Sequence, residues 1–134
     1  MQKLKNFRYS ISWAIVILIL SGINGKYIRK IHFQWFPIPK FTDKVVHFSM
    51  YFIFTALLIL SLIEIYPNKK FKILFISSII AFCYGVLMEV LQKFLFIGRS
   101  AEVLDVVANT TGIIACLVII EIYKQRKSRF LEKL

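Results

Sequence analysis

A chain of 134 residues is long enough for one domain, and 58% of its residues are hydrophobic while only 19% are charged. Because so few charged side chains cannot cover a soluble domain, the composition, with a mean hydropathy of +0.70, predicts a membrane protein. The net charge of +11 comes from basic residues that flank apolar stretches, with no nucleic-acid-binding motif beside them. We therefore expect no nucleic-acid partner, and we interpret the charge as setting membrane orientation and contacting anionic lipid head groups.

Four apolar stretches follow one another along the chain, at about residues 9–23, 45–66, 71–96 and 106–123. About 20 helical residues cross a bilayer core of ~30 Å, so the last three stretches are long enough and the first is the shortest. Each stretch is expected to be a helix, because a helix satisfies its own backbone hydrogen bonds in lipid. The sequence thus predicts a single all-α domain over residues 1–134, a polytopic four-helix transmembrane bundle.

The first stretch has two interpretations. It follows Lys3, Lys5 and Arg8, as the apolar region of a signal peptide would. However, only Ser21 and Gly22 offer small residues near its end, which is a weak cleavage site. We therefore expect this segment to be retained as the first helix.

The distribution of lysine and arginine predicts the orientation. Of the 18 basic residues, eleven lie at the two termini and in the loop between the second and third helices, and seven lie on the opposite side. Since basic residues are enriched in cytoplasmic segments, both termini are predicted to be cytoplasmic, in the plasma membrane of a bacterium.

Polar residues gather at the opposite, outer ends of the predicted helices. Eight of them are candidates for a shared site: Asp43, Lys44, His47, Glu89, Gln92, Arg99, Asp105 and Asn109. If the topology were inverted these residues would still share a side, so their clustering depends less on the charge count than the orientation does. The sequence predicts a polar pocket toward the outer face of the membrane.

Helical spacing places these residues on defined faces. Asp43, His47 and Tyr51 are four residues apart, as are Asp105 and Asn109, so each set lies along one side of its helix. Such polar stripes are expected to face the bundle interior, because polar groups in lipid are costly.

Small and amide side chains accompany the stripes. Gly85 lies one turn before Glu89 on the third helix, and Gly112 follows Asn109 on the fourth, which predicts close approach of neighbouring helices. Amides such as Gln92 and Asn109 are typical of interhelical hydrogen bonds.

The ionisable residues each have a structural and a functional interpretation. Glu89, an acid inside an apolar stretch, either pairs with Arg99 or His47 to hold helices together or takes part in binding or proton transfer. His47 alone is as consistent with an interhelical hydrogen bond as with acid–base chemistry. Asp43 and Asp105 precede apolar runs and are also suited to capping helices.

The cysteines and histidine spacing indicate no metal or cofactor. Cys83 and Cys116 each lie within an apolar stretch, as small buried side chains do. No Cys/His ligand spacing occurs along the chain, and no phosphate-binding glycine loop or nucleophile motif is present. The sequence therefore leads us to expect neither a cofactor nor a metal site.

Two motifs resemble those of VanZ-like membrane proteins. The first is Asp43-Lys44-Val45-Val46-His47-Phe48, followed by Tyr51. The second combines Glu89-x-x-Gln92 with Gly98-Arg99-Ser100, Asp105-Val106, Asn109 and Gly112. The resemblance covers about residues 37–119, with both motifs in order. It implies functional roles for Asp43, His47, Glu89, Gln92, Arg99, Asp105 and Asn109. It also implies a link, through the family's namesake, to resistance against the glycopeptide teicoplanin.

Two functions of different classes follow. In the first, a cell-envelope protein binds or modifies an anionic lipid-linked or wall-related ligand and affects glycopeptide susceptibility. Arg99 and Lys44 would hold the anion with Asp43, Gln92 and Asn109 nearby, and His47 would act as acid or base oriented by Asp105 or Glu89. In the second, the same charges only hold helices together in a scaffold or an oligomeric transporter subunit. Membrane lipids are partners in both, and enzymatic activity and a homo-oligomer are left open.

Overall fold

The computed structural model describes residues 7–22, 42–63, 65–66, 68–95 and 102–131, with side chains to residue 126. These ranges contain four helices in the expected order: α2 (Arg8–Gly22), α4 (Thr42–Ile63), α5 (Lys70–Phe94) and α6 (Val103–Leu131). The prediction of an all-α membrane bundle is therefore confirmed.

Two helices, α4 and α6, differ most from the predicted bounds. α4 begins at Thr42 and ends at Ile63, so it is shifted toward the amino terminus relative to 45–66. A turn follows, in which the Tyr66 carbonyl accepts a hydrogen bond from the Lys69 amide, and Asn68 has a positive φ of 66°, which asparagine tolerates well. α6 continues to Leu131, past the predicted end at 123, because hydropathy falls there while lysine, glutamine and arginine remain good helix formers.

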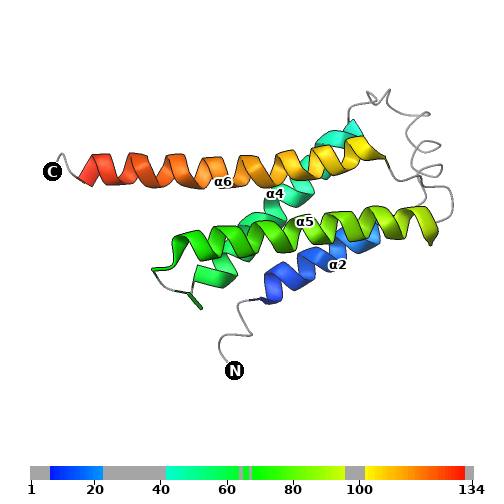
Figure 1. Cartoon of the computed structure of the whole chain (residues 1–134), viewed down its shortest axis with the longest axis horizontal. Coiled ribbons are helices and arrows are strands. Elements are labelled where there is room, and N and C mark those ends of the chain that lie inside the picture. Colours follow the sequence, from blue (N-terminus) through cyan, green and yellow to red (C-terminus); the bar gives the residue numbers. More distant parts are fainter. Residues whose placement is uncertain (1–6, 23–41, 64, 67, 96–101, 132–134) are drawn as a thin grey trace.

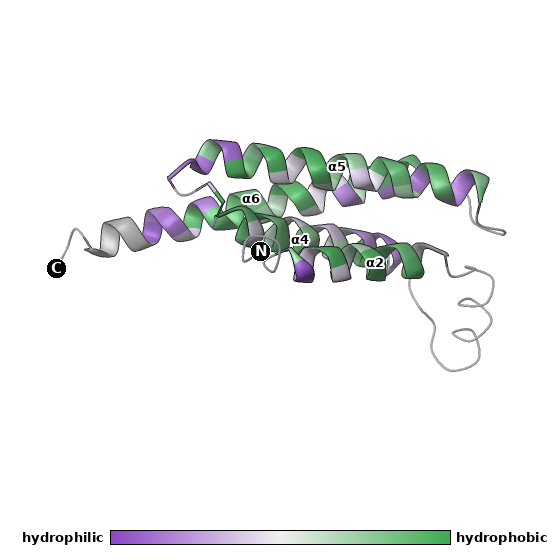
Figure 2. Cartoon of the chain, turned by 90° about the horizontal axis from the view of Figure 1, so that it is seen from below, coloured by the Kyte–Doolittle hydropathy of each residue, from purple (hydrophilic) through white to green (hydrophobic). Residues whose placement is uncertain are grey.

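Three of these helices are long and apolar enough to cross a membrane, over Thr42–Ile63, Lys70–Phe94 and Val103–Arg126. α2 is apolar but has only 15 residues, or about 23 Å of helix, which is shorter than the bilayer core. Figure 2 shows hydrophobic residues along the bundle and a hydrophilic stretch toward the carboxyl end of α6.

The helices bring distant parts of the sequence to one end of the bundle. Figure 1 shows the starts of α4 and α6 at the same end as the carboxyl ends of α2 and α5. The carboxyl part of α6 extends beyond the other helices at the opposite end. The predicted convergence of the second, third and fourth helices at one end is therefore present.

α4 lies at the centre of the packing, with its most extensive contact against α6. The main buried cluster includes Ile17, Tyr51, Phe54, Met88 and Ile113, contributed by all four helices. This shared apolar core fixes the positions from which the polar side chains project.

A glycine allows α4 and α6 to approach closely. A Cβ at position 112 would collide with the backbone carbonyl of Phe48 and lie 3.2 Å from the backbone nitrogen of Phe52. Backbone atoms cannot move aside as a flexible side chain can, so Gly112 sets the separation of the two helices.

The short helix α2 is attached by polar contacts. Ser10 and Ser61 hydroxyls lie 2.8 Å apart, and Trp13 Nε1 donates to the Met50 carbonyl at 3.0 Å. Tyr84 Oη of α5 donates to the Ala14 carbonyl at 2.7 Å. α2 is thereby bound to both α4 and α5.

Candidate functional site

The first turns of α4 and α6 supply the outer part of the site. Asp43 is the second residue of α4 and Asp105 the third of α6, where a carboxylate is favoured by the positive end of the helix dipole. Both acids therefore lie inside the first turn of their helices. This is the favourable position at the start of a helix that the sequence indicated. The two carboxylates also face each other, one from α4 and one from α6.

Lys44 links these acids. Its ammonium group forms ion pairs with Asp105, with Glu102 at 2.7 Å and with Asp43 at 3.5 Å. The side chains of Asp105 and Lys44 are 4% and 19% exposed, whereas those of Asp43 and Glu102 are about half exposed. The cluster thus runs from a buried carboxylate to a rim that is open at the end of the bundle.

His47 and Asn109 form the next layer, one helical turn deeper. His47 Nδ1 lies 3.1 Å from Asn109 Oδ1, and the two residues are 4% and 3% exposed. An amide oxygen can only accept a hydrogen bond, so Nδ1 is the donor in this pair, and the tautomer that carries this proton has its lone pair on Nε2. The pairing therefore fixes both the tautomer and the direction of the imidazole.

Tyr51 and Gly85 form the deepest layer. A Cβ at position 85 would lie 3.2 Å from Tyr51 Cε1 and 3.5 Å from Asn109 Nδ2, so the tyrosine ring and the amide meet over this glycine. Tyr51 Oη and Asn109 Nδ2 are buried and have no hydrogen-bond partner among the residues that the structure describes. Glu89, 5% exposed, lies one turn further along α5 on the same face.

The remaining candidates from the sequence are Gln92, Glu89 and Arg99, and the structure places them differently. Gln92 is buried, but its Nε2 approaches the Ser21 carbonyl of α2 at 3.5 Å, so it faces α2. The hydrogen bond of His47 with Asn109 replaces the Glu89–His47 pair that was one of the alternatives. Arg99, predicted to hold an anion, lies outside the described residues, and so does its alternative pairing with Glu89.

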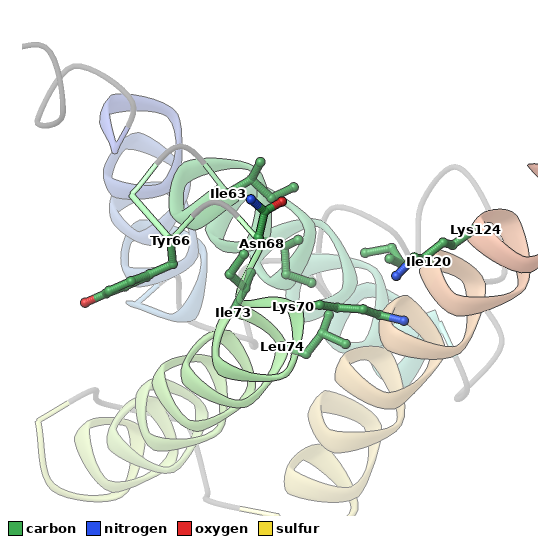
Figure 3. A pocket seen from close by; sticks show the side chains of 9 residues that line it. Ile63, Tyr66, Asn68, Lys70, Ile73, Leu74, Ile120 and Lys124 are labelled. Atoms are coloured by element: carbon green, nitrogen blue, oxygen red, sulfur yellow. The ribbon is translucent and has the colours of Figure 1, made fainter. Parts of the chain in front are cut away.

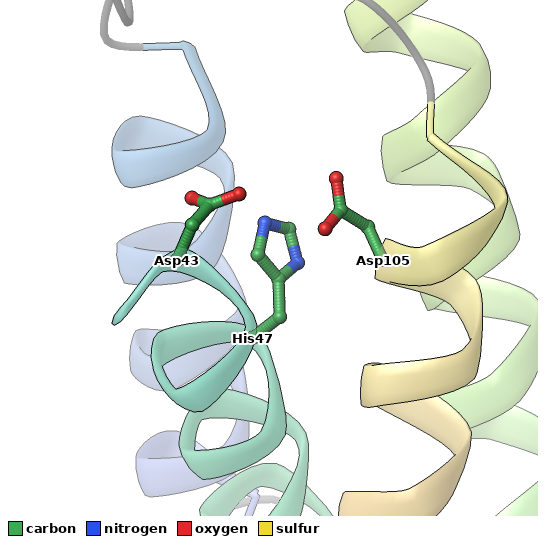
Figure 4. Close-up of side chains that lie close together, drawn as sticks. All are labelled: Asp43, His47 and Asp105. Atoms are coloured by element: carbon green, nitrogen blue, oxygen red, sulfur yellow. The ribbon is translucent and has the colours of Figure 1, made fainter. Parts of the chain in front are cut away.

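Three side chains of this cluster have atoms suited to metal coordination. One carboxylate oxygen each of Asp43 and Asp105 and one ring nitrogen of His47 all lie within 4.8 Å of one another. Figure 4 shows the imidazole between the two carboxyl groups, with Asp43 and His47 on α4 and Asp105 on α6. Ligand spacing along the chain did not indicate this group, because two helices separated by α5 contribute it.

Sequence reasoning did not select two residues of the cluster as site residues. Glu102, which precedes α6, pairs with Lys44, and its position three residues before Asp105 was the available signal. Tyr51 was placed on the Asp43–His47 face but not among the site residues, because a tyrosine in an apolar stretch is commonly a packing residue.

A separate pocket lies at the opposite end of the bundle. It has a volume of about 430 Å³, with mainly apolar walls that include Ile63, Ile73 and Ile120, and it is bordered by Lys70 and Lys124 (Figure 3). Lys70 also forms an ion pair with Glu121. None of the candidate site residues lines this pocket, so it is distinct from the polar cluster.

Comparison with known protein families identifies the family of the chain. The family model described as VanZ/LLP1 matches residues 4–124, which is most of the chain. The chain belongs to the VanZ/LLP1 family. The matched region contains every residue of the polar cluster and all three membrane-spanning segments up to Lys124. No curated protein and no solved structure matched the chain.

Family membership confirms the resemblance that the two motifs indicated. The family match and the three apolar spans together identify an integral membrane protein of the VanZ/LLP1 family. Within it, the motif residues Asp43, Lys44, His47, Asp105 and Asn109 form one contiguous group between α4 and α6.

Proposed function

We propose that this VanZ/LLP1-family protein binds the polar head group of an anionic lipid-linked or wall-related molecule at the polar cluster between α4 and α6. Ionisable side chains inside membrane helices are costly and commonly mark ligand or proton pathways. Here such groups lie on facing helices and reach the end of the bundle through the half-exposed Asp43 and Glu102. In the proposed orientation that end faces outward, toward the cell envelope.

The observation that carries the proposal is a pair of buried donors. Tyr51 Oη and Asn109 Nδ2 have no hydrogen-bond partner among the described residues. A buried donor without a partner costs about 1–3 kcal/mol, so these groups favour an oxygen-rich occupant that accepts from them. Phosphate and carboxylate oxygens are such acceptors.

His47 is the group best placed to move a proton if the ligand is also modified. Its Nδ1 is held by Asn109, and its imidazole lies between the carboxyl groups of Asp43 and Asp105, with one ring nitrogen and one oxygen of each acid within 4.8 Å of one another. A histidine oriented by one partner with its second nitrogen available is the arrangement that general acid–base catalysis uses.

Binding to a polyprenyl phosphate tests the proposal. The purified protein in nanodiscs should bind the phosphate more tightly than the matching polyprenyl alcohol, and Asn109→Leu should weaken phosphate binding at least tenfold. Lys93→Ala, an exposed cation of α5 outside the cluster, is the matched control. Equal affinity for phosphate and alcohol would remove the proposed ligand class.

A cellular experiment tests the envelope role. Deleting the gene, or replacing it with the His47→Gln variant, should change growth inhibition by teicoplanin, while Lys93→Ala should not. A response to deletion that His47→Gln fully restores would show that the envelope role does not need the polar cluster.

A purely structural role is the second candidate, and the contacts between α4 and α6 favour it. The Lys44–Asp105 ion pair and the His47–Asn109 hydrogen bond both join these helices. In a scaffold, substitutions at these positions should lower thermal stability and expression in proportion to any loss of binding. In a binding site, a conservative variant such as Tyr51→Phe should lose affinity at unchanged stability.

A further inference from the structure

We propose that Asp43, His47 and Asp105 form a binding site for a divalent cation of the type that accepts carboxylate and imidazole ligands together, such as Mn²⁺ or Zn²⁺. The three ligand atoms lie within 4.8 Å of one another. Around an ion with bonds of about 2.1 Å, neighbouring ligand atoms are about 3.0 Å apart in octahedral and about 3.4 Å apart in tetrahedral coordination. Binding of the ion would therefore require the aspartate side chains to rotate toward the imidazole.

The orientation of His47 is a second observation that points to a ligand. The ring is 4% exposed, and its Nδ1 donates to Asn109 Oδ1. Among the residues that the structure describes, the other ring nitrogen forms no hydrogen bond, and the ring lies between the two carboxyl groups (Figure 4). Metal-binding histidines are held in this way, with one nitrogen donating to an oxygen and the other facing the ion.

The charge of the cluster also favours a cation with more than one charge. Three carboxylates, those of Asp43, Glu102 and Asp105, surround the single ammonium group of Lys44. Lys44 is then a competitor for the metal position, since its ammonium group contacts two of the three proposed ligands. Its long side chain can instead pair with Glu102, which is half exposed at the rim.

Three protein ligands leave coordination positions for another molecule. Structural zinc sites are closed by four protein ligands, whereas zinc sites with three protein ligands retain an open position. The side chain of Asp43 is 48% exposed, so the open side faces the end of the bundle. A phosphate or carboxylate oxygen there would complete the coordination, and this explains how an acid-rich site holds an anion.

This inference deepens the proposed function, and its ligand part rests on that proposal. Cation binding itself is measured with the metal alone and without lipid. The two proposals can therefore be refuted separately. Absence of metal binding would refute the metal site, whereas absence of phosphate binding in metal-free protein would refute the proposed function.

Mn²⁺ titration of the full chain in detergent is the direct test. Bound Mn²⁺ loses the six-line electron paramagnetic resonance signal of the free ion, so the signal reports occupancy. We expect one saturable site per chain that Zn²⁺ displaces, and at least tenfold weaker binding for His47→Gln and for Asp43→Asn. Asp43→Asn is the key variant because its side chain is 48% exposed at the rim of the cluster, whereas that of Asp105 is 4% exposed.

Two further variants separate a metal site from nonspecific acidic binding. Lys44→Met removes the competing ammonium group and should tighten Mn²⁺ binding threefold or more. Glu121→Gln removes an acid that pairs with Lys70 on α5, away from the cluster, and should leave binding unchanged. Absence of saturable binding, or equal affinity of wild type, His47→Gln and Asp43→Asn, would overturn the inference.

Metal addition to a ligand-binding measurement connects the two proposals. If the ion holds the anion, Mn²⁺ should raise the affinity for a polyprenyl phosphate at least tenfold in wild type and not in Asp43→Asn. Unchanged phosphate affinity with demonstrated metal binding would refute the bridging role.

Discussion

His47 and Asn109 are 62 residues apart in the chain, yet a hydrogen bond of 3.1 Å joins them in the buried interface of α4 and α6. Replacing Asn109 with leucine removes this bond and leaves the imidazole Nδ1–H without an acceptor. Interhelical hydrogen bonds in membranes contribute about 0.6 kcal/mol on average and up to about 1.7 kcal/mol. Thermal unfolding of Asn109→Leu in detergent, followed by circular dichroism, should show a loss in this range.

Thr111→Ala is the matched control for this prediction. Thr111 is exposed on the same helix, and its hydroxyl donates a hydrogen bond to the backbone carbonyl of Val107, one turn earlier in α6. Its removal should leave the unfolding temperature nearly unchanged. Equal unfolding temperatures for the two variants would show that the His47–Asn109 bond adds no stability.

The Lys44–Asp105 ion pair should be stabilising only as a pair. Lys44→Ala leaves the carboxylate of Asp105, 4% exposed, without its cation, and we expect a loss of about 1–3 kcal/mol because Lys44 itself is partly exposed. The double variant Lys44→Ala/Asp105→Asn should recover much of this loss. A double-mutant cycle in chemical denaturant measures the coupling.

The ion pair at the other end of the bundle provides the comparison. The side chains of Lys70 and Glu121 are 37% and 41% exposed, so water screens them and their removal should have no measurable effect. A larger effect at Lys70 than at Lys44 would contradict the assignment of the buried pair as the stabilising one.

Gly112 should be the glycine least tolerant of substitution among the two packed glycines. A Cβ at position 112 meets the Phe48 backbone, whereas one at Gly85 meets the ring of Tyr51 at 3.2 Å, and a side chain can shift. We expect Gly112→Ala to destabilise by about 1–3 kcal/mol, as overpacking does, and Gly85→Ala to cost less. The unfolding temperatures of both variants test this prediction. A larger loss of stability for Gly85→Ala than for Gly112→Ala would contradict the close backbone contact at Gly112.

The proposed orientation predicts different chemical accessibility of the two ends of α6. Val103–Arg126 has 24 residues, or about 36 Å of helix, which is long enough to cross a membrane. In the proposed orientation, Glu102 and Gln125 should therefore lie on opposite sides of it. In a background without Cys83 and Cys116, Glu102→Cys should react with a membrane-impermeant maleimide in intact cells, and Gln125→Cys only after permeabilisation. The opposite pattern would invert the topology while leaving the site geometry unchanged.

Much of the fold followed from local properties of the sequence. The four apolar stretches predicted the four helices of the described residues and their order, because a polar backbone in lipid must satisfy its own hydrogen bonds. Helix ends were less accurately predicted: α6 continues past 123, since hydropathy and helix propensity are different quantities. The four-residue spacing of Asp43 and His47 likewise fixed their common face.

Contacts between helices depended on the tertiary structure. Sequence placed Gln92 with the polar cluster, but the position of α2 directs it to Ser21, and the partner of His47 was open until α6 brought Asn109 to it. The sequence alone thus predicted which residues lie at the same end of the bundle, but not which of them are in contact. Only the packing of α4 against α6 at Gly112 decides which of them touch, because such contacts join residues about 60 positions apart and depend on helix separation, which no local pattern encodes.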